Sequence, residues 1–302
     1  MRLFDQLIVK TLPLVPKPIV ASLSRPYIAG DNLDAAVNCV KSLNQKGFQV
    51  TIDILGEFVT HWDQAEESAK GYMDVLNAIK KHKLQSGISV KPTFFGLLLD
   101  QGRCEQLLWP LLEACAGMDK LMRLDMEDTP CTTKTIELYS RFQKKYPDHV
   151  GIVLQSYLRR TLADVQAITE MVPKANFRIC KGIYVEPLKL AYHGYQEIRD
   201  NFIASAKAMW DGGAFVGLAT HDDYLVEKSI EIIRERRLGP EDYEFQMLLG
   251  VREKLRDQIL ADGHNVRIYV PFGKDWYGYS VRRLKENPAL AGTMFKAIFF
   301  GK

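Results

Sequence analysis

The sequence lacks the signals of several protein classes. No stretch approaches the ~18 uninterrupted apolar residues of a transmembrane helix, and the net charge of +3 is too small to indicate nucleic-acid binding. Neither GxGxxG nor GxxxxGKS/T occurs, so the glycine-rich turns of dinucleotide-binding and P-loop folds are missing. What is present, with 47% hydrophobic and 25% charged residues, is typical of an ordinary soluble globular protein.

Cysteine is scarce and shows no pairing pattern. The five cysteines are odd in number and form no CxxC, which argues against a disulfide framework and a zinc site and favours a reducing cytoplasm. The N-terminal stretch MRLFDQLIVKTLPLVPKPIV is a poor signal peptide, because charges and three prolines interrupt its apolar residues. We expect a cytoplasmic protein, with peripheral contact to the inner face of the cell membrane as the weaker alternative.

Short β-branched runs alternate with amphipathic stretches along the chain. Eight strand signals spaced about 20 to 40 residues apart, each followed by a helical segment, predict an α/β protein built as a (β/α)₈ barrel. We expect an N-terminal helical arm at residues 1–45 and a single catalytic barrel at 46–302. The predicted strands are Gln49–Leu55, Ile88–Thr93, Leu121–Met126, Gly151–Ser156, Asn176–Cys180, Phe215–Thr220, Phe245–Leu248 and Val266–Val270.

Polar residues stand where these strands end, which is where such barrels hold their active sites. Lys91 lies inside the run ISVKPT, and a lysine buried there needs a carboxylate partner, for which Asp125 is the natural candidate. A purely structural pair explains these two residues about as well as a functional one. Asp53 and Glu57 are better explained as capping or ion-pairing residues. The polar residues at the other strand ends are Glu127, Gln155, Arg178, Lys181, Thr220, His221, Gln246 and Tyr269.

The last strand leads into a short helix with two adjacent arginines. Tyr279, Arg282, Arg283 and Glu286 are three and four residues apart and share one helix face. Paired guanidinium groups bind carboxylates in a bidentate way, so this face suits an anionic ligand, although a solvated Arg–Glu pair is the simpler explanation of an isolated RR. A metal site that uses His221 has weak support, because the histidine belongs to no HxH or HExxH motif.

Eight runs of the sequence, in order, resemble the proline dehydrogenases in their short, monofunctional bacterial form. They are VTIDILGE, ISVKPT, LDMED, LQSYLRRT, RICKGIYVEP, ATHDDY, EFQMLLG and YVPFGKDWYGYSVRRLKENP, and the resemblance covers roughly Gly47 to Pro288. The resemblance implies a distorted (β/α)₈ barrel that holds FAD at the strand C-termini. It also implies oxidation of L-proline to 1-pyrroline-5-carboxylate, the first step of proline degradation to glutamate, by hydride transfer from the ring carbon beside nitrogen to flavin N5.

The resemblance also implies partners and residue roles. Electrons would pass to a quinone, and a separate pyrroline-5-carboxylate dehydrogenase would consume the product. The implied substrate-binding residues are Lys91, Arg282, Arg283 and Leu248. The implied catalytic residues are Asp125, as the partner of the lysine, Arg178, near the reactive flavin nitrogen, and Tyr269, packed on the proline ring. The implied FAD contacts are Met126, Gln155, Arg178, Lys181, Gly182, Ile183, Thr220, His221 and Glu286.

Two details refine this expectation. The family often has KGAY where this chain has KGIY, so Ile183 could shift flavin or substrate packing. Relatives that act on hydroxyproline tend to carry a smaller residue in place of Tyr269, which favours proline itself. Two other functions are considered: a metal-dependent barrel lyase or hydrolase using Asp125, Glu127 and His221, and a non-catalytic barrel that senses proline or flavin.

Overall fold

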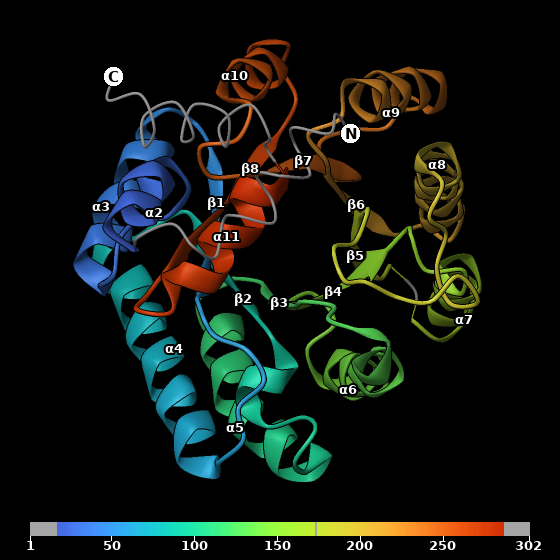
Figure 1. Ribbon diagram of the computed structural model, residues 1–302. Helices are drawn as coiled ribbons and strands as arrows, with labels where there is room; N and C mark the ends of the chain where they lie inside the picture. The colour runs from blue at the N-terminus through green and yellow to red at the C-terminus, as the bar shows by residue number, and fades with distance from the viewer. Residues whose placement is uncertain (1–16, 173, 287–302) are drawn as a thin grey trace.

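A computed structural model of the chain describes residues 17–172 and 174–286, without the side chains of residues 18, 19, 21, 23 and 282–286. Eight parallel strands form a closed barrel in chain order, with β8 pairing back to β1 (Figure 1). This confirms the predicted (β/α)₈ architecture. The strands are β1 (Gln49–Ile54), β2 (Ser86–Val90), β3 (Met122–Leu124), β4 (Val150–Gln155), β5 (Asn176–Cys180), β6 (Phe215–Ala219), β7 (Tyr243–Leu248) and β8 (Val266–Phe272).

Each strand is followed by a helix, as a parallel barrel requires. Two further helices, α2 (Lys17–Ser24) and α3 (Leu33–Gln45), precede the barrel, and the division of the chain at residue 45 stays a prediction. Short 3₁₀ turns are η2 (Arg25–Tyr27) and η3 (Pro92–Phe95). The helices that follow the strands are α4 (Trp62–His82), α5 (Gln101–Ala116), α6 (Thr129–Lys145), α7 (Thr161–Met171), α8 (Tyr195–Asp211), α9 (Asp223–Arg236), α10 (Glu253–Ala261) and α11 (Trp276–Glu286).

The barrel departs from regularity at its eighth helix. In the outer ring, α3 packs against β1 and β8, the position that the last helix covers in a regular barrel. The last helix, α11, packs instead against α2 and lies across the end of the barrel that faces the viewer (Figure 1). The displaced helix can therefore cover the C-terminal ends of the strands.

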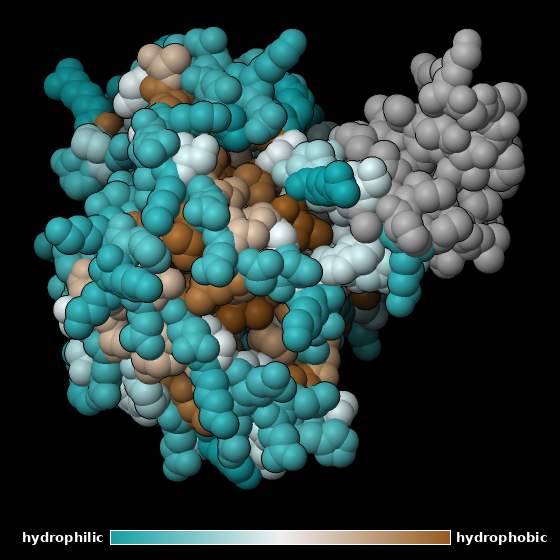
Figure 2. Space-filling model, turned by 90° about the vertical axis from the view of Figure 1, so that its left-hand side faces the viewer, coloured by the Kyte–Doolittle hydropathy of each residue, from teal (hydrophilic) through white to brown (hydrophobic). Residues whose placement is uncertain are grey.

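The surface near α2, α3 and α4 is mostly polar. Figure 2 shows this face, with hydrophilic side chains over most of it and apolar side chains gathered near its centre. Leu33 and Cys39 of α3 are only partly buried there and pack against the main core.

Among the helices of the described ranges, none combines the length and hydrophobicity that a membrane span needs. All five cysteines are free in this structure.

Candidate active site

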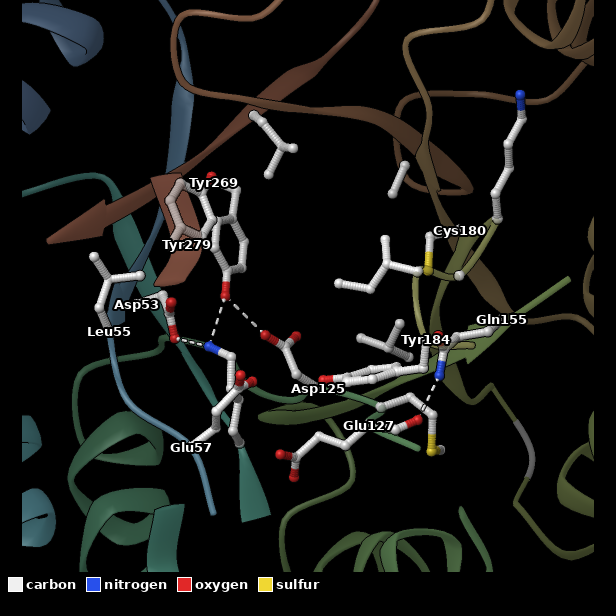
Figure 3. Close-up of a pocket in the computed structure, with 18 of the residues that line it drawn as sticks. Asp53, Leu55, Glu57, Asp125, Glu127, Gln155, Cys180, Tyr184, Tyr269 and Tyr279 are labelled. Carbon is white, nitrogen blue, oxygen red and sulfur yellow. Dashed lines mark hydrogen bonds and ion pairs between the residues drawn. The ribbon is translucent and has the colours of Figure 1, made fainter. Parts of the chain in front are cut away.

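A cavity of about 1140 Å³ opens at the C-terminal ends of the strands, beneath α11. Its volume exceeds the ~300–1,000 Å³ typical of small-ligand pockets. Figure 3 shows acidic side chains, an amide and tyrosines pointing into it from several strands. Each of the eight strands, or the residue directly after it, contributes to the lining, through Asp53, Lys91, Asp125, Gln155, Arg178, Ala219, Leu248 and Tyr269.

Lys91 enters the cavity from a position just beyond β2. The predicted strand Ile88–Thr93 included it, which is wrong, because β2 ends at Val90 and Lys91 is the N-cap of η3. Its Nζ lies 2.7 Å from Asp53 Oδ1, and the two side chains are 14% and 1% exposed. Burial lowers the pKa of Lys91, but the nearby carboxylates of Asp53 and Asp125 outweigh burial and leave it raised. Lys91 is therefore a buried cation that stays protonated.

Asp125 has different partners from those expected. Its Oδ1 accepts hydrogen bonds from Ser89 Oγ at 2.6 Å and from Arg178 Nη1 at 2.7 Å. Its Oδ2 accepts a hydrogen bond from the Tyr269 hydroxyl at 2.8 Å. The expectation that Asp125 pairs directly with Lys91 is wrong, because Asp53 takes that place. The two residues are linked through Tyr269, whose hydroxyl lies 3.5 Å from Lys91 Nζ (Figure 3).

Arg178 lies at the base of the cavity and is held from two sides. Its Nη1 forms the ion pair with Asp125, and its Nε donates to the side-chain oxygen of Gln246. The guanidinium carbon is 5.4 Å from the centre of the Tyr269 ring. Because these contacts come from β3, β7 and β8, the positive charge of Arg178 has a fixed position that does not depend on a ligand.

Glu127 is a second buried carboxyl in the lining. Its oxygens accept hydrogen bonds from the Thr93 backbone amide, at 2.9 Å, and from the Thr93 hydroxyl. Burial raises the pKa of Glu127 to about 7, although the hydrogen bonds from Thr93 work in the opposite direction. The Gln155 amide donates to the Glu127 backbone oxygen at 2.8 Å, so Gln155 is also held in place (Figure 3).

The loop after β5 allows a close approach to the backbone. Gly182 has φ +97°, and a Cβ added to it would lie 2.1 Å from Tyr157 Cδ1. Only glycine therefore fits at this position. Next to it, Lys181 Nζ lies 2.5 Å and Arg199 Nη2 lies 2.6 Å from the carboxylate of Asp222. Burial would raise the pKa of Asp222, but Arg199 and Lys181 hold it well below its usual value.

Two cations thus share one carboxylate at the edge of the cavity. The surplus positive charge, together with a glycine that lets a ligand approach the main chain, suits an anionic group such as a phosphate.

His221 lies at the cavity edge between β6 and β7. Its Nε2 accepts a hydrogen bond from the Leu248 backbone amide at 2.9 Å, which occupies one of the two ring nitrogens through which a histidine can bind a metal. Within residues 17–172 and 174–286, no three His, Cys, Asp or Glu side chains are grouped closely enough to hold a metal ion.

The cavity brings together most of the residues singled out in the sequence. All the residues predicted to bind substrate or cofactor or to act in catalysis line it, where their side chains are described. They are Lys91, Asp125, Met126, Gln155, Arg178, Lys181, Gly182, Ile183, Thr220, His221, Leu248 and Tyr269. The side chains of Arg282, Arg283 and Glu286, on α11, lie outside the described part of the chain. The roles assigned to all these residues stay predictions.

Two residues of the polar network were missed or undervalued. Asp53 was interpreted as a capping or ion-pairing residue, and its ion pair proves to be the one with Lys91. Ser89 was not singled out, although it contacts both Asp125 and Arg178. A signal was present, because residues two apart on a strand face the same side and Ser89 is two residues before Lys91.

Comparisons with known proteins agree with this geometry. The family model described as proline dehydrogenase matches residues 36–296. Proline dehydrogenase 2 of Bacillus subtilis (strain 168) is 32% identical over 271 residues, which cover 90% of this chain and 88% of the relative. The proline dehydrogenase of Deinococcus radiodurans is 29% identical and covers 99% of this chain and 100% of the relative.

A solved structure shares the fold. The crystal structure of proline utilization A (PutA) from Bdellovibrio bacteriovorus, inactivated by N-propargylglycine, aligns with a TM-score of 0.82 at 23% sequence identity. The alignment covers 93% of this chain but only 34% of the PutA chain, so this chain spans about a third of that larger protein.

Proposed function

This chain belongs to the proline dehydrogenase family, and on that premise we propose that it oxidises L-proline to 1-pyrroline-5-carboxylate with bound FAD. The observation that carries the proposal is the network at the base of the cavity. It sets a protonated lysine, an arginine and a tyrosine hydroxyl around one open space, and fixes each with buried carboxylates. A small amino acid with a carboxylate and few other polar groups needs such a site for orientation.

The lining also fits a flavin dinucleotide. The volume of about 1140 Å³ leaves room for a cofactor larger than a small substrate. Close approach at Gly182 and the cations Lys181 and Arg199 suit the diphosphate, while Arg178 and Gln155 supply polar atoms for a flavin ring. We further assign Met126, Ile183, Thr220, His221 and Glu286 as contacts to FAD.

Substrate binding would combine attraction and shape. Lys91, with Arg282 and Arg283 from α11, would bind the proline carboxylate, since cations on a rigid frame fix a carboxylate in one orientation. Tyr269 and Leu248 would pack against the ring and exclude water. The hydrogen bond from the Tyr269 hydroxyl to Asp125 would hold the tyrosine ring in place against the substrate.

The protein's part in the chemistry is then mainly electrostatic. Bound FAD would supply the electron acceptor, at N5, for a hydride that leaves the ring carbon beside nitrogen. Arg178, held by Asp125 and Gln246, would present a fixed positive charge where negative charge develops on that acceptor. Lys91 would keep the substrate carboxylate from moving during transfer.

The remaining partners follow from the products. Electrons would pass to a quinone, which requires at least peripheral contact with a membrane from a cytoplasmic location. The cyclic imine would pass to a separate pyrroline-5-carboxylate dehydrogenase in the degradation of proline to glutamate.

An anaerobic visible spectrum, recorded before and after addition of L-proline, tests the proposal. A flavin spectrum that bleaches with proline would support cofactor, substrate and hydride transfer together. An unchanged flavin spectrum would reject proline as substrate, and 4-hydroxyproline would be tested next. A colourless protein that FAD cannot reconstitute would reject the whole proposal.

The arginine assignment has its own test. Arg282→Met and Arg283→Met should each raise KM for proline severely while the protein retains FAD. Arg103→Met, at an exposed position on α5 that does not line the cavity, serves as the control. A normal KM in either α11 variant would refute the assignment of the carboxylate site.

A further inference from the structure

A second cavity, of about 350 Å³, lies at the opposite end of the barrel, where the strands begin. It shares no lining residue with the active-site cavity. Residues of seven strands line it, and those used below are Arg123 (β3), Asn176 (β5), Glu244 (β7) and Arg267 (β8). The reaction proposed above uses none of them.

Arg123 is the unusual member of this group. It is only 1% exposed, and within the described ranges its Nη1 donates hydrogen bonds only to backbone oxygens, those of Asn176 at 3.1 Å and Ile152 at 3.5 Å. Its Nε and Nη2 are buried and have no hydrogen-bond partner among the described residues. Gly151 makes room for the guanidinium, since a Cβ there would lie 2.5 Å from Nη1. The sequence thus maintains space for a buried arginine with two unused donors.

The charges inside the barrel do not balance at Arg123. Arg267 Nε lies 2.6 Å from Glu244, and Arg178 is paired with Asp125 on the other side. No carboxylate of the described ranges lies within ion-pairing distance of Arg123. Burial lowers the pKa of Arg123 to about 9, helped by the positive charge of Arg178 and opposed by the more distant carboxylate of Glu244, so the group is still protonated at neutral pH. An unpaired buried cation is costly, which creates a strong preference for an anion.

A buried acceptor belongs to a neighbouring residue, because Arg123 Nη1 contacts the Asn176 backbone oxygen. The side-chain oxygen of Asn176 is also buried and without a hydrogen-bond partner. Two donor nitrogens and one acceptor match an oxyanion that carries a hydroxyl group, whose oxygens accept from the arginine and whose hydroxyl donates to the amide oxygen. A halide or a fully deprotonated oxyanion would leave the Asn176 oxygen unused.

From this geometry we propose that the N-terminal end of the barrel binds a small hydroxyl-bearing oxyanion, such as hydrogen phosphate or bicarbonate, between Arg123 and Asn176. The site is independent of the reaction at the other end of the barrel. It would neutralise a charge that the fold otherwise leaves unpaired, and so it would stabilise the protein whenever the anion is present.

Thermal unfolding of the full chain, saturated with FAD, tests this proposal. Midpoints are measured against inorganic phosphate, bicarbonate and sulfate at fixed ionic strength and neutral pH. We expect a saturable rise of a few degrees with phosphate or bicarbonate, and a smaller rise with sulfate. Arg123→Met should remove the saturable part, whereas the control Arg103→Met should keep it. A rise with bicarbonate alone or phosphate alone would identify which source the site accepts.

A second variant covers the case in which Arg123→Met does not fold. Asn176→Asp has nearly the same shape and places a carboxylate beside Arg123. It should raise the midpoint without phosphate and remove the response to phosphate. The proposal is overturned if wild type shows no saturable response, or if the folded variants respond as wild type does.

Discussion

Changing Glu127 to glutamine is expected to remove a loss of stability that the protein suffers as the pH rises from about 5 to about 8. Glu127 is 1% exposed and accepts two hydrogen bonds from Thr93. Burial raises its pKa from the ordinary 4.5 to about 7, against the opposing effect of those hydrogen bonds. Between these values the folded protein keeps a proton that the unfolded chain has already lost.

The sign and size of the effect follow from proton linkage. A carboxyl with a raised folded pKa stabilises the fold fully below the unfolded pKa, and this contribution disappears as the pH rises through the folded pKa. A change from 4.5 to about 7 corresponds to about 3 kcal/mol, since one pKa unit is worth ~1.4 kcal/mol. Glutamine imitates the protonated acid, because it can accept from the Thr93 amide and donate to the Thr93 hydroxyl.

Urea denaturation at pH 5 and pH 8 measures the effect. Between these two pH values, the free energy of unfolding of Glu127→Gln should fall by about 2.5 kcal/mol less than that of wild type, because the unfolded carboxyl is already partly ionised at pH 5. Glu113→Gln, whose side chain is 51% exposed on α5, is the matched control and should follow wild type. Equal losses in wild type and Glu127→Gln would mean that the buried carboxyl does not hold its proton, which would refute the reasoning.

Three further changes probe the cavity. Asp53→Asn leaves Lys91 buried without its counter-ion, so urea denaturation should show a loss near the lower end of the ~3–5 kcal/mol typical of broken buried pairs; an unchanged stability would contradict the pairing. Tyr269→Ser should lower kcat/KM more for proline than for 4-hydroxyproline, and equal losses would exclude Tyr269 as a specificity residue. Gly182→Ala should destabilise the protein and weaken FAD retention. The control Gly213→Ala, with φ +70° but no atom within 4 Å of its new Cβ, should cost only ~1–2 kcal/mol of backbone strain. Similar losses of stability in both variants would rule out steric exclusion at Gly182.

The strands could be predicted from the sequence because each is a short β-branched run that is buried in the barrel wall. The predicted bounds of β5, Asn176–Cys180, are those of the structure, and β8 was found at its start, Val266. The predicted C-terminal bounds of the strands were less accurate where a polar residue follows the last buried residue. Lys91 follows a fully buried run and was counted with it, although Pro92 removes a backbone donor and begins a 3₁₀ turn there.

The course of the eighth helix could not be predicted. Periodicity places a helix after β8, and the structure has one, α11. The surface that α11 covers depends on α3, which precedes the barrel in the chain. The apolar side of α3 already packs on β1 and β8, so that face is not available to α11. Such competition between two amphipathic segments for one face depends on the assembled barrel, and local pattern carries no information about it.

The partner of Lys91 shows most clearly what sequence order leaves undecided. Val90 and Leu124 are paired in neighbouring strands. The residues that follow them, Lys91 and Asp125, are therefore at the same height, which made Asp125 a reasonable choice of partner. Asp125 is already engaged, however, by Ser89 and Arg178 on one oxygen and by Tyr269 on the other. The long lysine side chain therefore turns toward β1 and binds Asp53, deeper in the barrel. A rigid arginine from β5 and a tyrosine from β8 decide this pairing, and they lie 53 and 144 residues away from Asp125 along the chain. The partner of a buried charge in this closed barrel thus depends on which strands bring donors to each carboxylate. The same strands place the residues of the candidate active site around one cavity.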